Sequence, residues 1–151
     1  MKIIVYSVLV LIFSIVCFGC NREKSVEEQM DVKTTICYIA VADKDTAWLK
    51  IDTAGTQFLG VFQLNNSKQK RKHVGQVKGV LRGDTLKGHF DFKVNDVDKW
   101  YRNPIAFLKR DGKLIMGVGA TNMVWGSAYF DEKVPINFDK GKFVFEEGIC
   151  K

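Results

Sequence analysis

The segment LKGHFDFKV, residues 86–94, decides the fold class because apolar and polar side chains alternate along it. In an extended strand, Leu86, Phe90, Phe92 and Val94 lie on one face, while the charged and histidine side chains lie on the other. A period of two with one apolar face is typical of a strand in an antiparallel sheet whose other face meets water.

The same alternation recurs along the chain from residue 35. It predicts strands at 46–52, 56–64, 74–82, 105–110 and 113–119, with further strands at 36–42, within 122–130 and at 142–147. Short turn signals at 53–56, 83–85 and 111–112 join neighbouring strands as hairpins. No amphipathic helix of useful length interrupts this order. We therefore expect an all-β domain over residues 35–151, an antiparallel up-and-down meander of about 8–10 strands.

Glycines inside the predicted strands favour closure of the sheet into a small barrel. Gly60, Gly79, Gly88 and Gly117 fall at such positions, where glycine costs stability unless it relieves a bend or a close approach. A two-sheet sandwich is the alternative architecture.

Length and composition limit the class of protein. A chain of 151 residues, 46% hydrophobic and 26% charged, fits one globular domain, which excludes a multi-domain enzyme and a collagen-like, low-complexity or wholly disordered chain. The formal net charge is +6.

The N-terminus carries an export signal. Residues 3–19 are almost entirely apolar, a length that fits either a signal peptide or a short membrane helix. The junction VCFGC at 16–20 resembles the cleavage box of bacterial lipoproteins, in which a cysteine is lipidated and becomes the first mature residue. We expect a signal peptide over 1–19, a lipid on Cys20 and a polar tether over 20–34. An uncleaved membrane anchor is the alternative.

Two cysteines remain in the mature domain, Cys37 in the first predicted strand and Cys150 after the last. An exported chain meets an oxidising compartment, and the first and last strands of an up-and-down barrel are neighbours. A disulfide between them is therefore expected, with two unpaired thiols as the alternative. Neither cysteine has a histidine close in sequence, so we expect no metal site.

Three segments carry a family resemblance: CYIA at 37–40, GVLRGDTLKG at 79–88 and the ending 143–150. Together they resemble small, uncharacterised envelope lipoproteins of the Bacteroidota with a lipocalin-like β-barrel, over roughly residues 36–150. The resemblance implies an anchored domain in the bacterial cell envelope, on the outer membrane, and it brings no assigned catalytic residues.

A basic cluster lies in the predicted connection between two strands, at Lys68, Lys70, Arg71 and Lys72. Four positive charges at a hairpin tip would attract an anionic surface such as lipid headgroups. A solvated loop that keeps an edge soluble is the alternative. Because loss of Lys2 with the signal peptide lowers the net charge to +5, these four residues account for most of it. No aromatic residue interleaves the cluster, so we expect no nucleic-acid partner.

Aromatic residues form a second candidate site. Trp48 falls on the polar face of its strand, and Trp100, Tyr101 and Arg102 follow one another in a longer loop. Such side chains line a barrel mouth and contact a ligand or partner, or else they plug the end of the barrel.

Three Asp-Thr pairs, each followed by a small or aliphatic residue, resemble the O-glycosylation acceptor of Bacteroidota. They make Thr46, Thr53 and Thr85 candidate acceptors. The alternative is that Asp-Thr suits turns and strand starts.

Signatures of catalysis are missing from the sequence. It contains no G-x-S-x-G, H-E-x-x-H or phosphate-binding glycine motif, and we expect His73 and His89 to be solvated surface residues. The sequence thus favours a non-enzymatic, lipid-anchored, monomeric barrel without a cofactor, which binds a small apolar ligand or an envelope component. A loop-mediated interaction or inhibitor protein of the envelope is the alternative.

Overall fold

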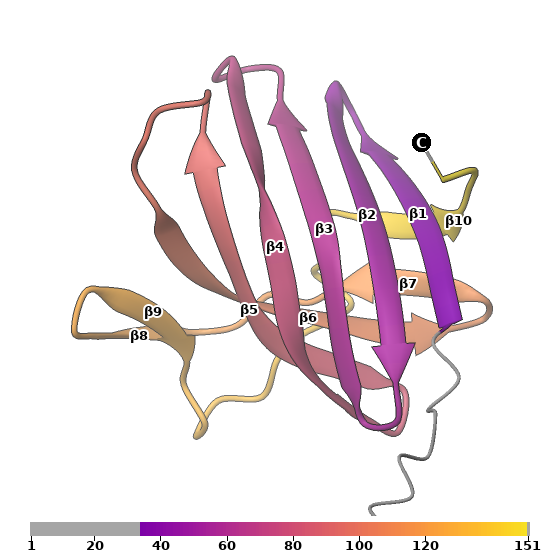
Figure 1. Ribbon diagram of the computed structural model, residues 1–151. Coiled ribbons are helices and arrows are strands. Elements are labelled where there is room, and N and C mark those ends of the chain that lie inside the picture. Colours follow the sequence, from indigo (N-terminus) through magenta and orange to yellow (C-terminus); the bar gives the residue numbers. More distant parts are fainter. Residues whose placement is uncertain (1–33, 151) are drawn as a thin grey trace, which may run out of the picture. The chain divides into compact units, whose positions relative to one another are not determined.

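The computed structural model describes residues 34–150, which form ten strands. The strands are β1 Thr34–Ala42, β2 Asp45–Ala54, β3 Gln57–Asn66, β4 Arg71–Arg82, β5 Thr85–Val94, β6 Tyr101–Arg110, β7 Lys113–Met116, β8 Thr121–Val124, β9 Ser127–Phe130 and β10 Val144–Glu147 (Figure 1). The predicted all-β fold is confirmed. Within this range no helix is long and apolar enough to cross a membrane. The predicted signal peptide, Cys20 and most of the tether lie outside the described residues.

Eight antiparallel strands close into a barrel in the order β1-β10-β7-β6-β5-β4-β3-β2. The predicted closed meander is confirmed, with one addition. After β7 the chain leaves the barrel wall, forms the separate two-stranded hairpin β8–β9, and returns as β10 to pair with β1 and β7. Figure 1 shows this hairpin extending beyond the barrel wall, on the side away from β1 and β10.

Phenylalanine rings fill the centre of the barrel. Phe62, Phe90, Phe107 and Phe145 come from four different strands. The ring centroid of Phe62 lies 4.8 Å from that of Phe90 and 6.2 Å from that of Phe107, and Phe107 and Phe145 are 5.6 Å apart. Edge-to-face ring contacts across the barrel axis leave little room between the walls.

One cavity between the barrel strands is small. A cavity lined by Tyr38, Ile51, Leu86 and Leu114 among others has about 10 Å³, which is roughly the space of one water molecule.

Glycines bring adjacent strands into close contact, as predicted. A Cβ on Gly79 would overlap the Lys87 carbonyl oxygen and the Cα of Gly88, its partner on β5. Gly60 and Gly75 are equally crowded by backbone of the neighbouring strand. Such positions let the sheet coil tightly enough to close.

The predicted disulfide between Cys37 and Cys150 is confirmed. It lies beside the closing seam, where β1 and β10 are paired at only Tyr38↔Glu147 and Ile39↔Glu146. The Gly148 amide adds one hydrogen bond, donated to the Cys37 carbonyl oxygen at 2.9 Å. The disulfide therefore reinforces the weakest part of the wall.

Candidate binding groove between the β5–β6 loop and the β8–β9 hairpin

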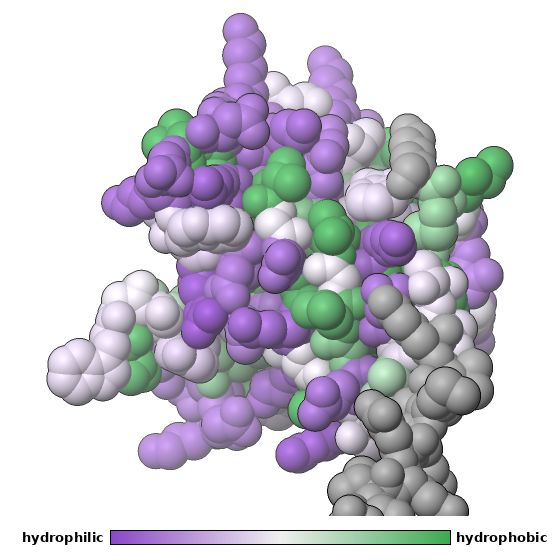
Figure 2. Space-filling model, in the orientation of Figure 1, coloured by the Kyte–Doolittle hydropathy of each residue, from purple (hydrophilic) through white to green (hydrophobic). Residues whose placement is uncertain are grey.

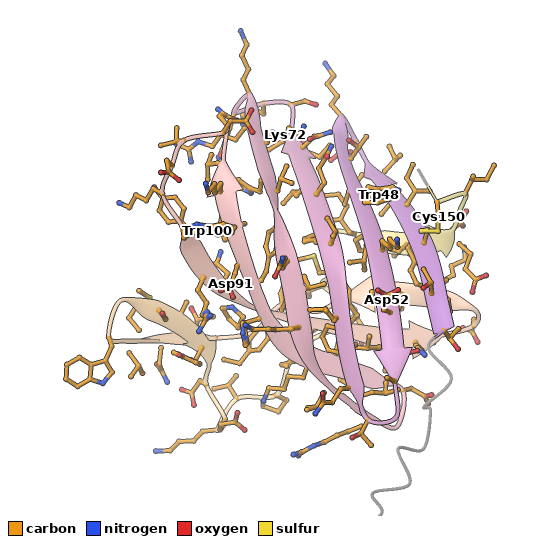
Figure 3. All side chains as sticks on the ribbon, viewed as in Figure 1. Trp48, Asp52, Lys72, Asp91, Trp100 and Cys150 are labelled. Atoms are coloured by element: carbon orange, nitrogen blue, oxygen red, sulfur yellow. A yellow bond between two sulfur atoms is a disulfide. The ribbon has the colours of Figure 1, made fainter. Side chains whose placement is uncertain are left out.

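An open groove of about 1140 Å³ lies at the end of the barrel beside the β5–β6 loop. We call it the β5–β6 groove. Its walls are the start of β4, the end of β5 with the loop after it, the start of β6, and the hairpin β8–β9. Two lining residues, His73 and Phe92, face the barrel interior. The lining also includes Arg71, Asp91, Lys99, Trp100, Tyr101 and Arg102. Figure 3 shows Trp100 and Asp91 on this side of the molecule, with the hairpin below them.

An ion pair between neighbouring strands forms the floor of the groove. The Arg102 guanidinium donates two hydrogen bonds to the Asp91 carboxylate, at 2.5 and 2.8 Å, and the two residues are directly paired across β5 and β6. This bidentate contact with Arg102 holds the pKa of Asp91 below its usual range, and the same contact raises the pKa of Arg102. The pair therefore stays charged at every physiological pH.

His89 lies beside this pair and is half-buried, so the expectation of a solvated side chain is wrong for it. Its Nε2 atom is enclosed without a hydrogen-bond partner, 3.9 Å from the nearer Asp91 oxygen. Burial, followed by the positive charge of Arg102, lowers the pKa of His89. The imidazole is therefore neutral near pH 7.

His73 is also half-buried, although the sequence suggested a solvated loop position. It belongs to β4, and its ring centroid lies 5.1 Å from that of Phe92. Burial, followed by the nearby charge of Arg71, lowers its pKa. The period-two pattern places residue 73 on the same side of β4 as the core residue Val77, which explains the burial.

Three of the four predicted contact residues meet at the groove. Trp100 is 60% exposed, with the Lys93 ammonium 5.1 Å from its ring centroid. Tyr101 stacks on Phe92 at 5.7 Å, with the Lys99 ammonium 5.2 Å from its own ring. Trp100 and Tyr101 keep 60% and 40% of their surface exposed, so both side chains can contact a ligand.

Trp48, the fourth predicted contact residue, lies elsewhere. Its side chain is half-buried on the outer wall of β2, where it lines a smaller hollow of about 330 Å³ with Ile39 and Gln63 among others. Its indole Nε1 is buried without a hydrogen-bond partner. Figure 3 places Trp48 on a different part of the wall from Trp100, so the two do not form one rim.

The predicted basic cluster lies at the β3–β4 turn, with Lys70 in a left-handed conformation (φ 50°). The turn is fixed from two sides. The Ser67 amide donates to the Asp45 carboxylate at 2.8 Å, and the Lys72 amide donates to the Asn95 side chain at 2.7 Å. Figure 2 shows hydrophilic residues gathered at this end of the barrel. Arg71 alone of the four predicted cations lines the groove.

Asp45 is the most enclosed charged residue in the described range, although the sequence suggested an ordinary turn aspartate. It is 6% exposed and accepts a hydrogen bond from the Lys142 ammonium at 2.5 Å. That bond, together with the one from Ser67, lowers the pKa of Asp45. The carboxylate thus ties the β1–β2 and β3–β4 ends to the segment before β10.

The three candidate glycosylation sites are half-buried positions in strands. The Thr46 hydroxyl accepts a hydrogen bond from the Asn65 side chain at 3.2 Å. The Thr53 hydroxyl faces the Thr34 carbonyl at 3.5 Å, and Thr85 begins β5 beside the exposed turn at Gly83. Their modification stays a prediction.

The sequence reasoning missed the tip of the β8–β9 hairpin. Trp125 there is fully exposed, and Met123 is 68% exposed. The sequence does contain a sign of this exposed apolar segment, because no charged residue occurs between Lys113 and Asp131. The single strand predicted within 122–130 is in fact two short strands, joined by a turn at Trp125-Gly126.

Comparisons with protein-family models, curated proteins and solved structures found no match to this chain.

Proposed function

We propose that this chain is a non-enzymatic binding protein of the bacterial cell envelope, which holds an anionic envelope component in the β5–β6 groove. The observation that carries the proposal is the contrast between the centre of the barrel and the groove at its end. Phenylalanine rings meet across the barrel axis, while exposed aromatic and cationic side chains collect around the β5–β6 groove. A small apolar ligand inside the barrel, the other possibility considered from sequence, has no support from this packing.

The chemistry of the groove favours an anionic ligand with an apolar part. Among residues 34–150, the structure pairs neither Arg71 nor Lys99 with a carboxylate. The only acidic side chain among the lining residues, Asp91, is already neutralised by Arg102. The exposed parts of the Trp100 and Tyr101 side chains supply apolar contact area beside these charges. A phosphate- or carboxylate-bearing amphiphile matches this combination.

Anchoring completes the proposal. Cleavage before Cys20 and lipidation of its thiol would hold the barrel at the outer membrane, close to such components. The support for this step is the junction at residues 16–20 and the polar tether that follows. Concentration at the membrane would let a modest intrinsic affinity suffice.

A nuclear magnetic resonance titration tests the groove directly. Dodecyl phosphate and neutral dodecyl glucoside, both below their micelle concentrations, are added to the isotopically labelled protein. We expect dodecyl phosphate to shift the signals of the Trp100 indole and the Arg71 side chain, and dodecyl glucoside to shift them much less. Shifts confined to core methyl groups such as Leu49 and Leu114 would place the ligand inside the barrel and overturn the proposal, as would no shifts at all.

A matched pair of variants on one strand serves as the control. Arg71 begins β4 and the exposed Arg82 ends it, at the opposite end of the barrel. Arg71→Gln should weaken dodecyl phosphate binding about tenfold, the loss of one charge-assisted contact of about 1.5 kcal/mol. Arg82→Gln should leave it unchanged.

A further inference from the structure

The β8–β9 hairpin presents an apolar tip, in which Met123 lines the groove but Val124 and Trp125 do not. Met123, Val124 and Trp125 are 68%, 47% and 101% exposed, and Tyr129 on the second strand is 45% exposed. In Figure 2 the projecting hairpin is pale to green, in contrast to the purple end of the barrel. A fully exposed tryptophan on an uncharged hairpin is unusual on a soluble surface.

Backbone conformation makes the tip more unusual. Val124 pairs with Ser127, so Trp125 and Gly126 form a two-residue turn, with φ values of 50° and 78°. Two positive φ values define a turn in which Asn-Gly or Gly-Gly is preferred and a bulky residue is strained. A tryptophan in this conformation lowers the stability of the turn. Its presence at the outermost position therefore points to a function for the indole.

The base of the hairpin is held firmly. The Phe130 ring packs closely against Gly119, and Ile136 against Gly117. The Asp131 amide donates to the Ala120 carbonyl at 2.8 Å, and β9 lies against β6. The tip is consequently projected from the wall by a fixed support.

We propose that this hairpin tip inserts into the headgroup region of an anionic phospholipid bilayer. Two observations favour a bilayer over a protein partner. The tip projects from the barrel and carries no charged side chain to specify one protein partner. Trp, Tyr and Met suit the boundary between apolar chains and headgroups. The adjoining groove carries Arg71 and Lys99, which the structure pairs with no carboxylate among residues 34–150, and their charge complements anionic headgroups.

Membrane contact through Val124 and Trp125, which do not line the groove, is distinct from the ligand site and from the anchor. The groove proposal depends on Arg71, Trp100 and Tyr101, and the anchor depends on Cys20. Insertion of the tip would orient the barrel at the membrane, with the groove turned toward the lipid surface.

Tryptophan fluorescence tests the insertion, because the chain contains only Trp48, Trp100 and Trp125. The full chain is reconstituted in vesicles of equimolar phosphatidylethanolamine and phosphatidylglycerol with brominated acyl chains. In the Trp48→Phe/Trp100→Phe variant, we expect the remaining Trp125 emission to shift to the blue and to be quenched by the lipid. In the Trp100→Phe/Trp125→Phe variant, the remaining Trp48 on the other part of the wall should show neither change. Trp125 emission that stays solvent-like and is not quenched by the lipid would overturn the proposal.

Trp125→Asn separates membrane contact from folding. Asn-Gly suits the turn better than Trp-Gly, so the thermal midpoint should stay the same or rise. Vesicle binding of the Cys20→Ser chain should fall at least about tenfold when Trp125→Asn is added, since one large apolar side chain no longer leaves water. Trp48→Phe is the matched control and should leave vesicle binding unchanged. Unaltered vesicle binding by Trp125→Asn, or a cross-link from position 125 to a protein and not to lipid, would contradict bilayer insertion.

Discussion

Asp91 and Arg102 show how one contact serves both the wall and the groove. They are paired across β5 and β6, and β6 lies against β9 of the hairpin. Hydrogen bonding with the Tyr129 hydroxyl also favours the charged form of Arg102. The ion pair therefore links the barrel wall to the hairpin that it supports.

Replacement of Asp91 by asparagine should destabilise the fold by about 1–2 kcal/mol, because a half-buried guanidinium loses its charged acceptor. Urea unfolding at pH 7 measures the change. Asp98→Asn is the control, since Asp98 pairs with Lys93 at an exposed position and its loss should not move the unfolding midpoint. Equal effects of the two substitutions would show that the Asp91–Arg102 pair has no special role.

His73 and His89 predict a dependence of stability on pH. The pKa of each is lowered in the folded protein, chiefly by burial, so the unfolded chain binds more protons as the pH falls. Stability is then fully present above the ordinary histidine pKa of about 6.5 and decreases below it. Carboxylates with lowered pKa values, such as Asp45 and Asp91, add a further loss only below about pH 4.

The double substitution His73→Gln/His89→Gln should flatten the curve of unfolding free energy between about pH 7 and pH 5. Chemical denaturation across that range provides the measurement. A curve that stays as steep as that of the unmodified protein would assign the pH dependence to other groups.

At the scale of elements, the weakest part of the wall is the short strand β10. It has four residues and only two residue pairs with each of β1 and β7. The long strands β2 to β5 share nine or ten residue pairs at each of the three junctions between them. Closure of the barrel therefore relies on the core residues Phe143 and Phe145 and on the disulfide beside them.

Removal of the disulfide by Cys37→Ser/Cys150→Ser should lower the free energy of unfolding by about 4–5 kcal/mol. The reason is that a cross-link spanning 113 residues restricts the conformational entropy of the unfolded chain. Urea unfolding with and without reductant measures it. Free thiols at both positions in the denatured, unreduced protein would contradict the cross-link.

The elements also show what a sequence can reveal. The ends of strands whose apolar residues alternate, such as β2 and β5, are predicted within two residues. In a pleated strand every second side chain points toward the core, so alternation in the sequence reports burial directly. The sequence does not predict β8 and β9 as two separate strands, because both strands lack a buried face and therefore lack alternation. Whether the barrel is hollow was also beyond the sequence, since it depends on which rings meet across the axis.

At the scale of the whole molecule, the two ends of the barrel differ. β1 begins at one end, and the basic β3–β4 turn lies at the other, near Lys72 in Figure 3. A tether that enters at Thr34 thus joins the end opposite the basic turn. Of the predicted site residues, Trp100, Tyr101 and Arg102 could be grouped because they are adjacent in sequence. Their meeting with Arg71 and the hairpin depends on long-range pairing that no local pattern encodes.

Anchoring makes a prediction at this scale. Cys20→Ser should leave the chain without lipid and free of the membrane in cell fractionation, apart from the weak contact proposed for the hairpin, which high salt should weaken. Retention of the variant in salt-washed membranes would indicate an uncleaved apolar helix over residues 3–19.

We propose that the ligand binds in the β5–β6 groove and not at the packed centre of the barrel, and site-specific photo-cross-linking in the native envelope tests this most directly. A photoreactive residue is placed at Trp100 in the groove, and in a second strain at Leu59, which is exposed on β3 and does not line the groove. We predict a discrete adduct of small mass from position 100 and none from position 59. A protein-sized adduct would indicate the interaction or inhibitor role, and no adduct from position 100, or the same adducts from both positions, would contradict the claim.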